Sequence, residues 1–126
     1  MWGQPPFVIS DNCALDVRNL KAAREWYKEK LGLRDSRDRR EDDSGRPFAD
    51  LVFAGEDALL SLVELAPGAS PEKAHVILFA KNLEKAHKWL ADRGVPVAPL
   101  ATASAGNPLF EFLDLDGNAI EVCVEP

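Results

Sequence analysis

The chain has 126 residues, of which 46% are hydrophobic and 29% are charged, and its formal net charge is −6. This length and composition suit one compact globular domain. The acidic balance argues against nucleic acid and anionic membranes as partners, because both select for clustered Lys and Arg. No apolar run approaches the ~20 residues of a membrane helix, and no secretion signal is evident, so we expect a cytoplasmic protein.

The two cysteines, Cys13 and Cys123, lie far apart in strand-like segments. Free thiols in a reducing cytoplasm are the expected state. A disulfide between them is the alternative.

A sequence segment near the N-terminus is repeated in the second half of the chain. LDVRNLKAAREWYKEK (15–30) and LFAKNLEKAHKWLADR (78–93) share Leu, Asn, Leu, Ala and Trp at an offset of 63 residues, from position 15 to position 78. Both copies then reach a glycine. A repeat at half the chain length predicts two copies of one structural unit.

Each copy predicts a strand, a helix and three further strands. The helices follow apolar residues at helical spacing. Asn19 and Asn82 suit their N-caps, and Gly32 and Gly94 suit the left-handed position past their ends. The opening strands are expected at 12–17 and 75–80. The remaining strands are expected at about 33–40, 47–54 and 58–65 in the first copy, and at about 96–103, 108–114 and 118–124 in the second.

The segment APGASPEK (66–73) is rich in Pro, Gly and Ser and is expected to link the two copies. LDLDGN (113–118) predicts a turn between two strands, because its Gly and Asn tolerate positive φ. We therefore expect a single domain over 1–126, with module 1 at about 7–66 and module 2 at about 74–126.

Two consecutive βαβββ modules resemble the vicinal oxygen chelate superfamily, which contains glyoxalase I, bleomycin resistance proteins and extradiol dioxygenases. The segments that carry the resemblance are LDVRNLKAAREWYKEKLGL, HVILFAKNLEKAHKWLADRGV and FLDLDGNAIEV. The family usually has proline where Leu115 stands, a departure without chemical consequence. The resemblance implies an α+β fold in which two tandem βαβββ modules form a curled mixed-sheet cup with helices outside, and it implies a homodimer.

Strand alternation predicts which side chains face the cup. Leu15 and Leu78 are expected to pack under the helices, which would turn Asn12 and His75 into the cup. In the last strand, Glu121 and Cys123 lie opposite an apolar face, so the carboxylate is either on the cup side or in solvent.

The family places metal ligands on the first residue of each opening strand and on the last strand of each module. The resemblance puts these ligands at Asn12, His75 and Glu121, with the fourth at Ser61 or, through a bulge, at Glu64. His75 and Glu121 suit Zn²⁺, Fe²⁺, Ni²⁺ or Mn²⁺. Asn12 and Ser61 are weak ligands, so we expect a divalent metal that is weakly held or absent.

Several residues have a structural interpretation beside the functional one. His75 is a ligand or a capping histidine, and Glu121 is a pocket carboxylate or a solvated strand residue. Asn12 is a polar pocket residue or a turn former. The candidate ligand-binding residues are Asn12, Ser61, Phe79, Phe110, Phe112 and Cys123. The phenylalanines are pocket walls or core, and the sequence does not decide between the two.

Two functions follow from the resemblance. The first is small-molecule binding of the bleomycin-resistance kind, as in drug or metabolite sequestration, with an incomplete metal site. The second is a divalent-metal-dependent lyase or isomerase of the glyoxalase type, in which Glu121 or a displaced ligand moves the proton. A dioxygenase is disfavoured, because it would need two histidines and a carboxylate in the cup. His87, in the second helix, is expected to lie outside it.

Overall fold

The two halves of the chain form two βαβββ modules in the computed structural model, which describes residues 6–7, 12–36, 47–53, 59–70, 76–102 and 108–124. Module 1 comprises β1 (Cys13–Val17), α1 (Leu20–Leu31), β2 (Arg34–Asp35), β3 (Phe48–Val52) and β4 (Leu59–Glu64). Module 2 comprises β5 (Val76–Ala80), α2 (Leu83–Asp92), β6 (Ala101–Thr102), β7 (Pro108–Leu113) and β8 (Ala119–Val124).

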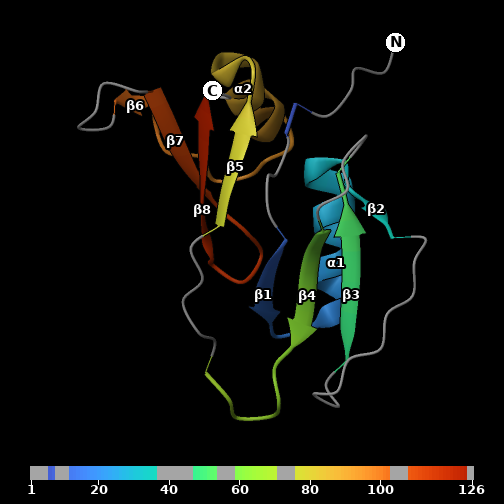
Figure 1. Ribbon diagram of the computed structural model, residues 1–126. Coiled ribbons are helices and arrows are strands. Elements are labelled where there is room, and N and C mark those ends of the chain that lie inside the picture. The colour runs from blue at the N-terminus through green and yellow to red at the C-terminus, as the bar shows by residue number, and fades with distance from the viewer. Residues whose placement is uncertain are drawn as a thin grey trace.

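Each module makes one four-stranded mixed sheet. The strand orders are β1-β4-β3-β2 and β5-β8-β7-β6, and the opening strand of each module pairs in parallel with its last strand. In Figure 1, α1 lies behind β3 and β4, and α2 lies by the upper end of β5; each sheet has one face turned away from its helix. We call these two faces the open faces. The predicted α+β class and the doubled βαβββ order are confirmed.

The strand predicted at about 96–103 is shorter than expected within the described residues, since β6 has two residues. Of the strand predicted at about 33–40, β2 covers Arg34–Asp35, and residues 37–40 lie outside the described part of the chain. Before β6, Val97 alone forms a bridge, to Phe112. Pro96 and Pro99 flank it, and a proline cannot donate to a strand ladder.

Both helices begin and end as the sequence predicts. The side chains of Asn19 and Asn82 accept hydrogen bonds from the third following backbone N–H, each at 3.0 Å. Gly32 and Gly94 have φ of 72° and 75°, the left-handed region that glycine adopts without strain. The N-caps therefore set where the opening strand of each module ends and the following helix begins.

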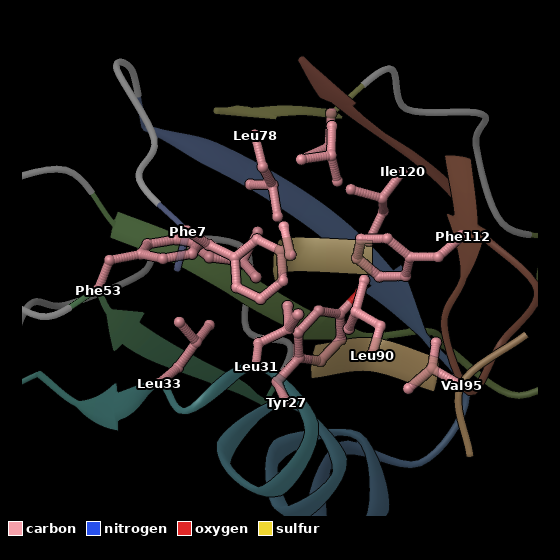
Figure 2. Close-up of a cluster of buried hydrophobic side chains, with 14 of the residues drawn as sticks. Phe7, Tyr27, Leu31, Leu33, Phe53, Leu78, Leu90, Val95, Phe112 and Ile120 are labelled. Atoms are coloured by element: carbon pink, nitrogen blue, oxygen red, sulfur yellow. The ribbon is translucent and has the colours of Figure 1, made fainter. Parts of the chain in front are cut away.

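A single core joins the modules, and Figure 2 shows its side chains meeting from both halves. Tyr27 and Leu31 of α1 and Leu90 of α2 are fully buried in it. Trp26 packs against this core, and so does Trp89, whose indole Nε1 donates to the Lys30 carbonyl at 2.8 Å. These aromatic residues of the helices therefore serve packing.

Asp114 is a buried carboxylate that binds the modules together. It is 6% exposed and accepts the Tyr27 hydroxyl at 2.5 Å. It also accepts the backbone N–H groups of Asp116 and Asn118 and the side-chain amide of Asn118, so four donors meet its two oxygens. A buried carboxylate is tolerated only when hydrogen bonds compensate its desolvation, and here they fix the β7–β8 turn against α1.

None of the described helices is long and apolar enough to cross a membrane.

Tyr27 is the only tyrosine, so its ionisation can be followed by absorbance. Burial, and then the charge and hydrogen bond of Asp114, raise the pKa of Tyr27 well above 10.0. We predict that tyrosinate absorbance at ~295 nm stays absent in the native protein past pH 10 and appears near the reference pKa of about 10 once urea unfolds the chain. A native midpoint near 10 would contradict the buried contact.

The same shift makes stability depend on alkaline pH. The unfolded chain releases the Tyr27 proton near pH 10 while the native protein retains it, so the free energy of unfolding falls as pH rises above about 10. Tyr27→Phe should cost about 1–3 kcal/mol at pH 7 through the lost hydrogen bond and should show a shallower alkaline decline. Urea unfolding at several pH values measures both effects.

Candidate functional site

The open face of the second sheet carries Glu121 in the middle of β8. Its Cα partners are Ile77 on β5 and Glu111 on β7. Glu121 and Ile77 are partly buried, and Glu111 is exposed. Phe110 and Phe112 of β7 and Ile120 and Val122 of β8 are at most 1% exposed and belong to the core, so alternation places the two carboxylates together on the uncovered side.

Cys123 lies beside Glu121 on this face. Its Sγ donates to Glu121 Oε2 at 3.2 Å. Burial, followed by the hydrogen bond and the charge of Glu121, raises the pKa of Cys123 to about 11. The thiol is therefore protonated at neutral pH and supplies a weak donor to the carboxylate rather than a nucleophile.

A hollow of 370 Å³ opens next to these residues. It is lined by Pro96, Val97, Ala98, Glu111, Phe112, Leu113 and Ala119. The 96–98 segment forms one wall, because the Ala98 N–H donates to the Glu111 carbonyl at 2.8 Å. Its lining is mostly apolar, and Glu111 is its charged residue. The hollow therefore suits an apolar ligand that carries a hydrogen-bond donor or a positive charge.

His87 supports this wall from behind. Its Nε2 lies 2.9 Å from the Ala98 carbonyl oxygen, and its ring packs edge-on against buried Phe110 at 5.0 Å between centroids. Since a carbonyl only accepts, Nε2 carries the hydrogen. His87 lies on α2, outside the cup as expected, and holds the hollow's wall.

The open face of the first sheet carries a hydroxyl and a carboxylate in contact. Ser61 on β4 is 8% exposed, and its Oγ donates to Asp50 Oδ1 on β3 at 2.6 Å. Glu64 points the other way, and its Oε2 accepts the Leu20 N–H at the start of α1 at 2.8 Å. Of the two candidates for the fourth ligand, Ser61 is therefore the one on the open face, and Glu64 caps a helix.

The other predicted site residues divide between the two faces. Phe79 is half-buried on the open face, and Asn12 is exposed at the start of β1. Phe110 and Phe112 are 1% exposed and belong to the core on the helix-covered face. Phe112 also contacts the hollow. His75 lies outside the described residues.

Three features of the site were not found from the sequence: Asp50, Glu111 and the wall at 96–98. The two acids are placed by the pairing of β3 with β4 and of β7 with β8. That register depends on hairpin lengths that alternation within one strand does not reveal.

The described residues do not complete a metal centre. Within the part of the chain that the structure describes, no three His, Cys, Asp or Glu side chains are grouped to hold a metal ion. Glu121 is a suitable ligand. The Ser61 hydroxyl, already donated to Asp50, is not.

The comparisons with known proteins agree with this fold. The family model described as "Glyoxalase/Bleomycin resistance protein/Dioxygenase superfamily" matches residues 9–122. The chain therefore belongs to this superfamily. A comparison with curated protein sequences gives no match.

Solved structures of low sequence identity share the fold. A superfamily member from Sphaerobacter thermophilus DSM 20745 is 23% identical with a TM-score of 0.77, over 94% of this chain and 98% of that one. An integron cassette protein from the mobile metagenome of the Halifax Harbour sewage outfall is 22% identical with a TM-score of 0.76, over 94% and 100%. A glyoxylase/bleomycin resistance protein/dioxygenase domain from Frankia sp. EAN1pec is 22% identical with a TM-score of 0.71, over 94% and 98%.

The contact between Cys123 and Glu121 predicts a measurable thiol reactivity. In a Cys13→Ser background, Glu121→Gln should lower the pKa of Cys123 below its value of about 11, because the negative charge that opposes thiolate formation is gone. Alkylation by iodoacetamide at pH 8.5 should then become several-fold faster.

Glu111→Gln is the matched control, since Glu111 lies opposite Glu121 but is no cause of the Cys123 shift. Equal acceleration by both substitutions, or none by Glu121→Gln, would contradict the arrangement.

Proposed function

We propose that this protein binds a small organic molecule on its open faces, as in drug or metabolite sequestration, and holds a divalent metal weakly or not at all. The observation that carries the proposal is the 370 Å³ hollow on the open face of the second sheet, beside the Glu111–Glu121 pair. Phe79, Cys123 and Asn12 are the further ligand-binding residues that we propose.

The residues at the proposed metal-ligand positions favour small-molecule binding over metal-dependent catalysis. At the fourth ligand position stands Ser61, which donates its proton to Asp50, and Asn12 offers only an amide oxygen. Ligand number and type set how tightly a site retains a divalent ion. We therefore expect purified protein that is loaded with Zn²⁺, Ni²⁺ or Mn²⁺ and gel-filtered to retain well below one metal per chain.

The second candidate is a metal-dependent lyase or isomerase that uses His75 and Glu121. Glu121 on the open face favours it, since a carboxylate there is a ligand in the glyoxalase arrangement that the resemblance implies. Stoichiometric metal retention that His75→Ala abolishes would support this candidate and overturn the first. In both cases we expect a cytoplasmic homodimer, which sedimentation and size-exclusion measurements test.

Filling the hollow tests the binding proposal. A thermal screen of thiol adducts, aromatic diols and glycopeptide drugs should find a compound that raises the melting temperature, since a ligand of the native state stabilises by about 2.7 kcal/mol at 100 times its Kd. Ala119→Leu places a larger side chain in the hollow and should abolish that shift.

Ala91→Leu is the control, because Ala91 is exposed on α2, behind the sheet. If Ala119→Leu leaves the ligand's shift intact, the ligand binds elsewhere and the hollow is not the site.

A further inference from the structure

The hollow of the second sheet begins at a pair of carboxylates. Glu111 lines it together with Leu113 and Ala119, which form the next cross-strand pair on the same face. The 96–98 segment closes one side, held to β7 by the hydrogen bond from the Ala98 N–H to the Glu111 carbonyl. A volume of 370 Å³ lies at the low end of the range of about 300–1,000 Å³ that ligand pockets span. The hollow therefore suits a small ligand.

The face around the two carboxylates is otherwise uncharged on the described strands. Glu111 and Glu121 are cross-strand partners, and Glu121 is partly buried. On β5, β7 and β8 the same face carries five apolar side chains and one thiol: Ile77, Phe79, Leu109, Leu113, Ala119 and Cys123. Apolar neighbours exclude water from a charge, and the attraction between opposite charges strengthens as the water is excluded.

Neither carboxylate is neutralised within the described part of the chain. No Lys or Arg there forms an ion pair with Glu111 or Glu121. Glu121 accepts the Cys123 thiol at 3.2 Å, a weak donor that carries no charge. Like charges directly opposite each other on a sheet repel. One positive group between the two carboxylates would relieve this repulsion.

An organic cation suits this arrangement better than a metal ion or an anion does. Among the described residues, no third His, Cys, Asp or Glu joins the pair to complete a ligand set, and divalent ions are held by several such groups. The side chains that line the hollow beside Glu111 are apolar and cover a hydrocarbon body instead. Both carboxylates repel an anionic ligand.

We propose that the ligand is a small organic monocation, with its ammonium nitrogen between Glu111 and Glu121 and its apolar body in the hollow beside Leu113 and Ala119. This inference rests on the proposed binding function and names its ligand class. The two parts act together, because a charge pair at a partly exposed site contributes little by itself and the burial of apolar area supplies the rest.

The test uses 2-phenylethylamine as the probe, with 2-phenylethanol and 3-phenylpropanoate as its neutral and anionic counterparts. Binding is measured by NMR titration at low ionic strength and neutral pH, where the amine is protonated. The amine should bind at least about tenfold more tightly than the alcohol, the size of one charged hydrogen bond, and the carboxylate should bind more weakly than the alcohol.

Glu111→Gln separates the charge from the hollow. It should weaken the amine about tenfold and leave the alcohol within about twofold, because the apolar lining is unchanged. Glu121→Gln removes the other charge, should weaken the amine by a similar factor, and provides the test if Glu111→Gln does not fold. Ala119→Leu occupies the hollow and should weaken the amine and the alcohol alike.

Glu84→Gln is the matched control, since it removes one negative charge from the exposed first turn of α2. It should leave all three affinities unchanged. Three results would overturn the inference: no binding of the amine, equal affinities for the amine and the alcohol, or equal losses in Glu111→Gln and Glu84→Gln.

The proposed function has a separate outcome. If a compound from the thermal screen binds in a way that Ala119→Leu abolishes and Glu111→Gln and Glu121→Gln do not affect, small-molecule binding stands and the monocation does not.

Discussion

The hydrogen bond between Tyr27 and Asp114 is a buried polar contact that links the two modules within the hydrophobic core they share. The Asp114 carboxylate closes the β7–β8 turn by accepting three hydrogen bonds from residues of that turn. It also accepts a hydrogen bond from the Tyr27 hydroxyl of α1, in the other module. A second link runs from the Arg18 N–H to Asp116 at 3.0 Å. The hairpin that carries Glu111 and Glu121 is therefore positioned by module 1.

Fixing this hairpin has a consequence for the open faces. The helices and the shared core occupy one side of both sheets, so every second residue of each strand is turned to the other side. Polar residues accumulate there because burial is not required of them. Glu111, Glu121, the Cys123 thiol and the hollow thus lie on the side that the core leaves uncovered.

Much of the fold follows from short-range signals in the sequence. The repeat gives the module order, Asn19 and Asn82 give the helix starts, and Leu15 and Leu78 give the buried faces, all of which the structure confirms. The helix starts and the buried faces depend on residues within one or two turns of chain, whereas the module order depends on the repeat at an offset of 63 residues. The strand predicted at about 96–103 was overestimated because Pro96 and Pro99 act on pairing with a distant strand, which a local pattern does not report.

The site was less predictable, because it depends on pairing between strands. Glu64 is the carboxylate nearest to Ser61 in sequence, yet it caps α1, and Asp50, eleven residues away, contacts Ser61. The sequence left Phe110 and Phe112 between pocket wall and core, and their burial assigns both to the core. The register of β3 with β4 and of β7 with β8 places Asp50 beside Ser61 and Glu111 beside Glu121.

The most direct test of the binding face is a titration of the ¹⁵N-labelled protein with the compound that the thermal screen identifies, followed by amide chemical shifts. The account predicts saturable shifts in β7, in β8 and in the 96–98 segment that line the hollow, with little change along α1. Shifts that concentrate on the helices, or that spread over all acidic surface residues without saturation, would contradict it.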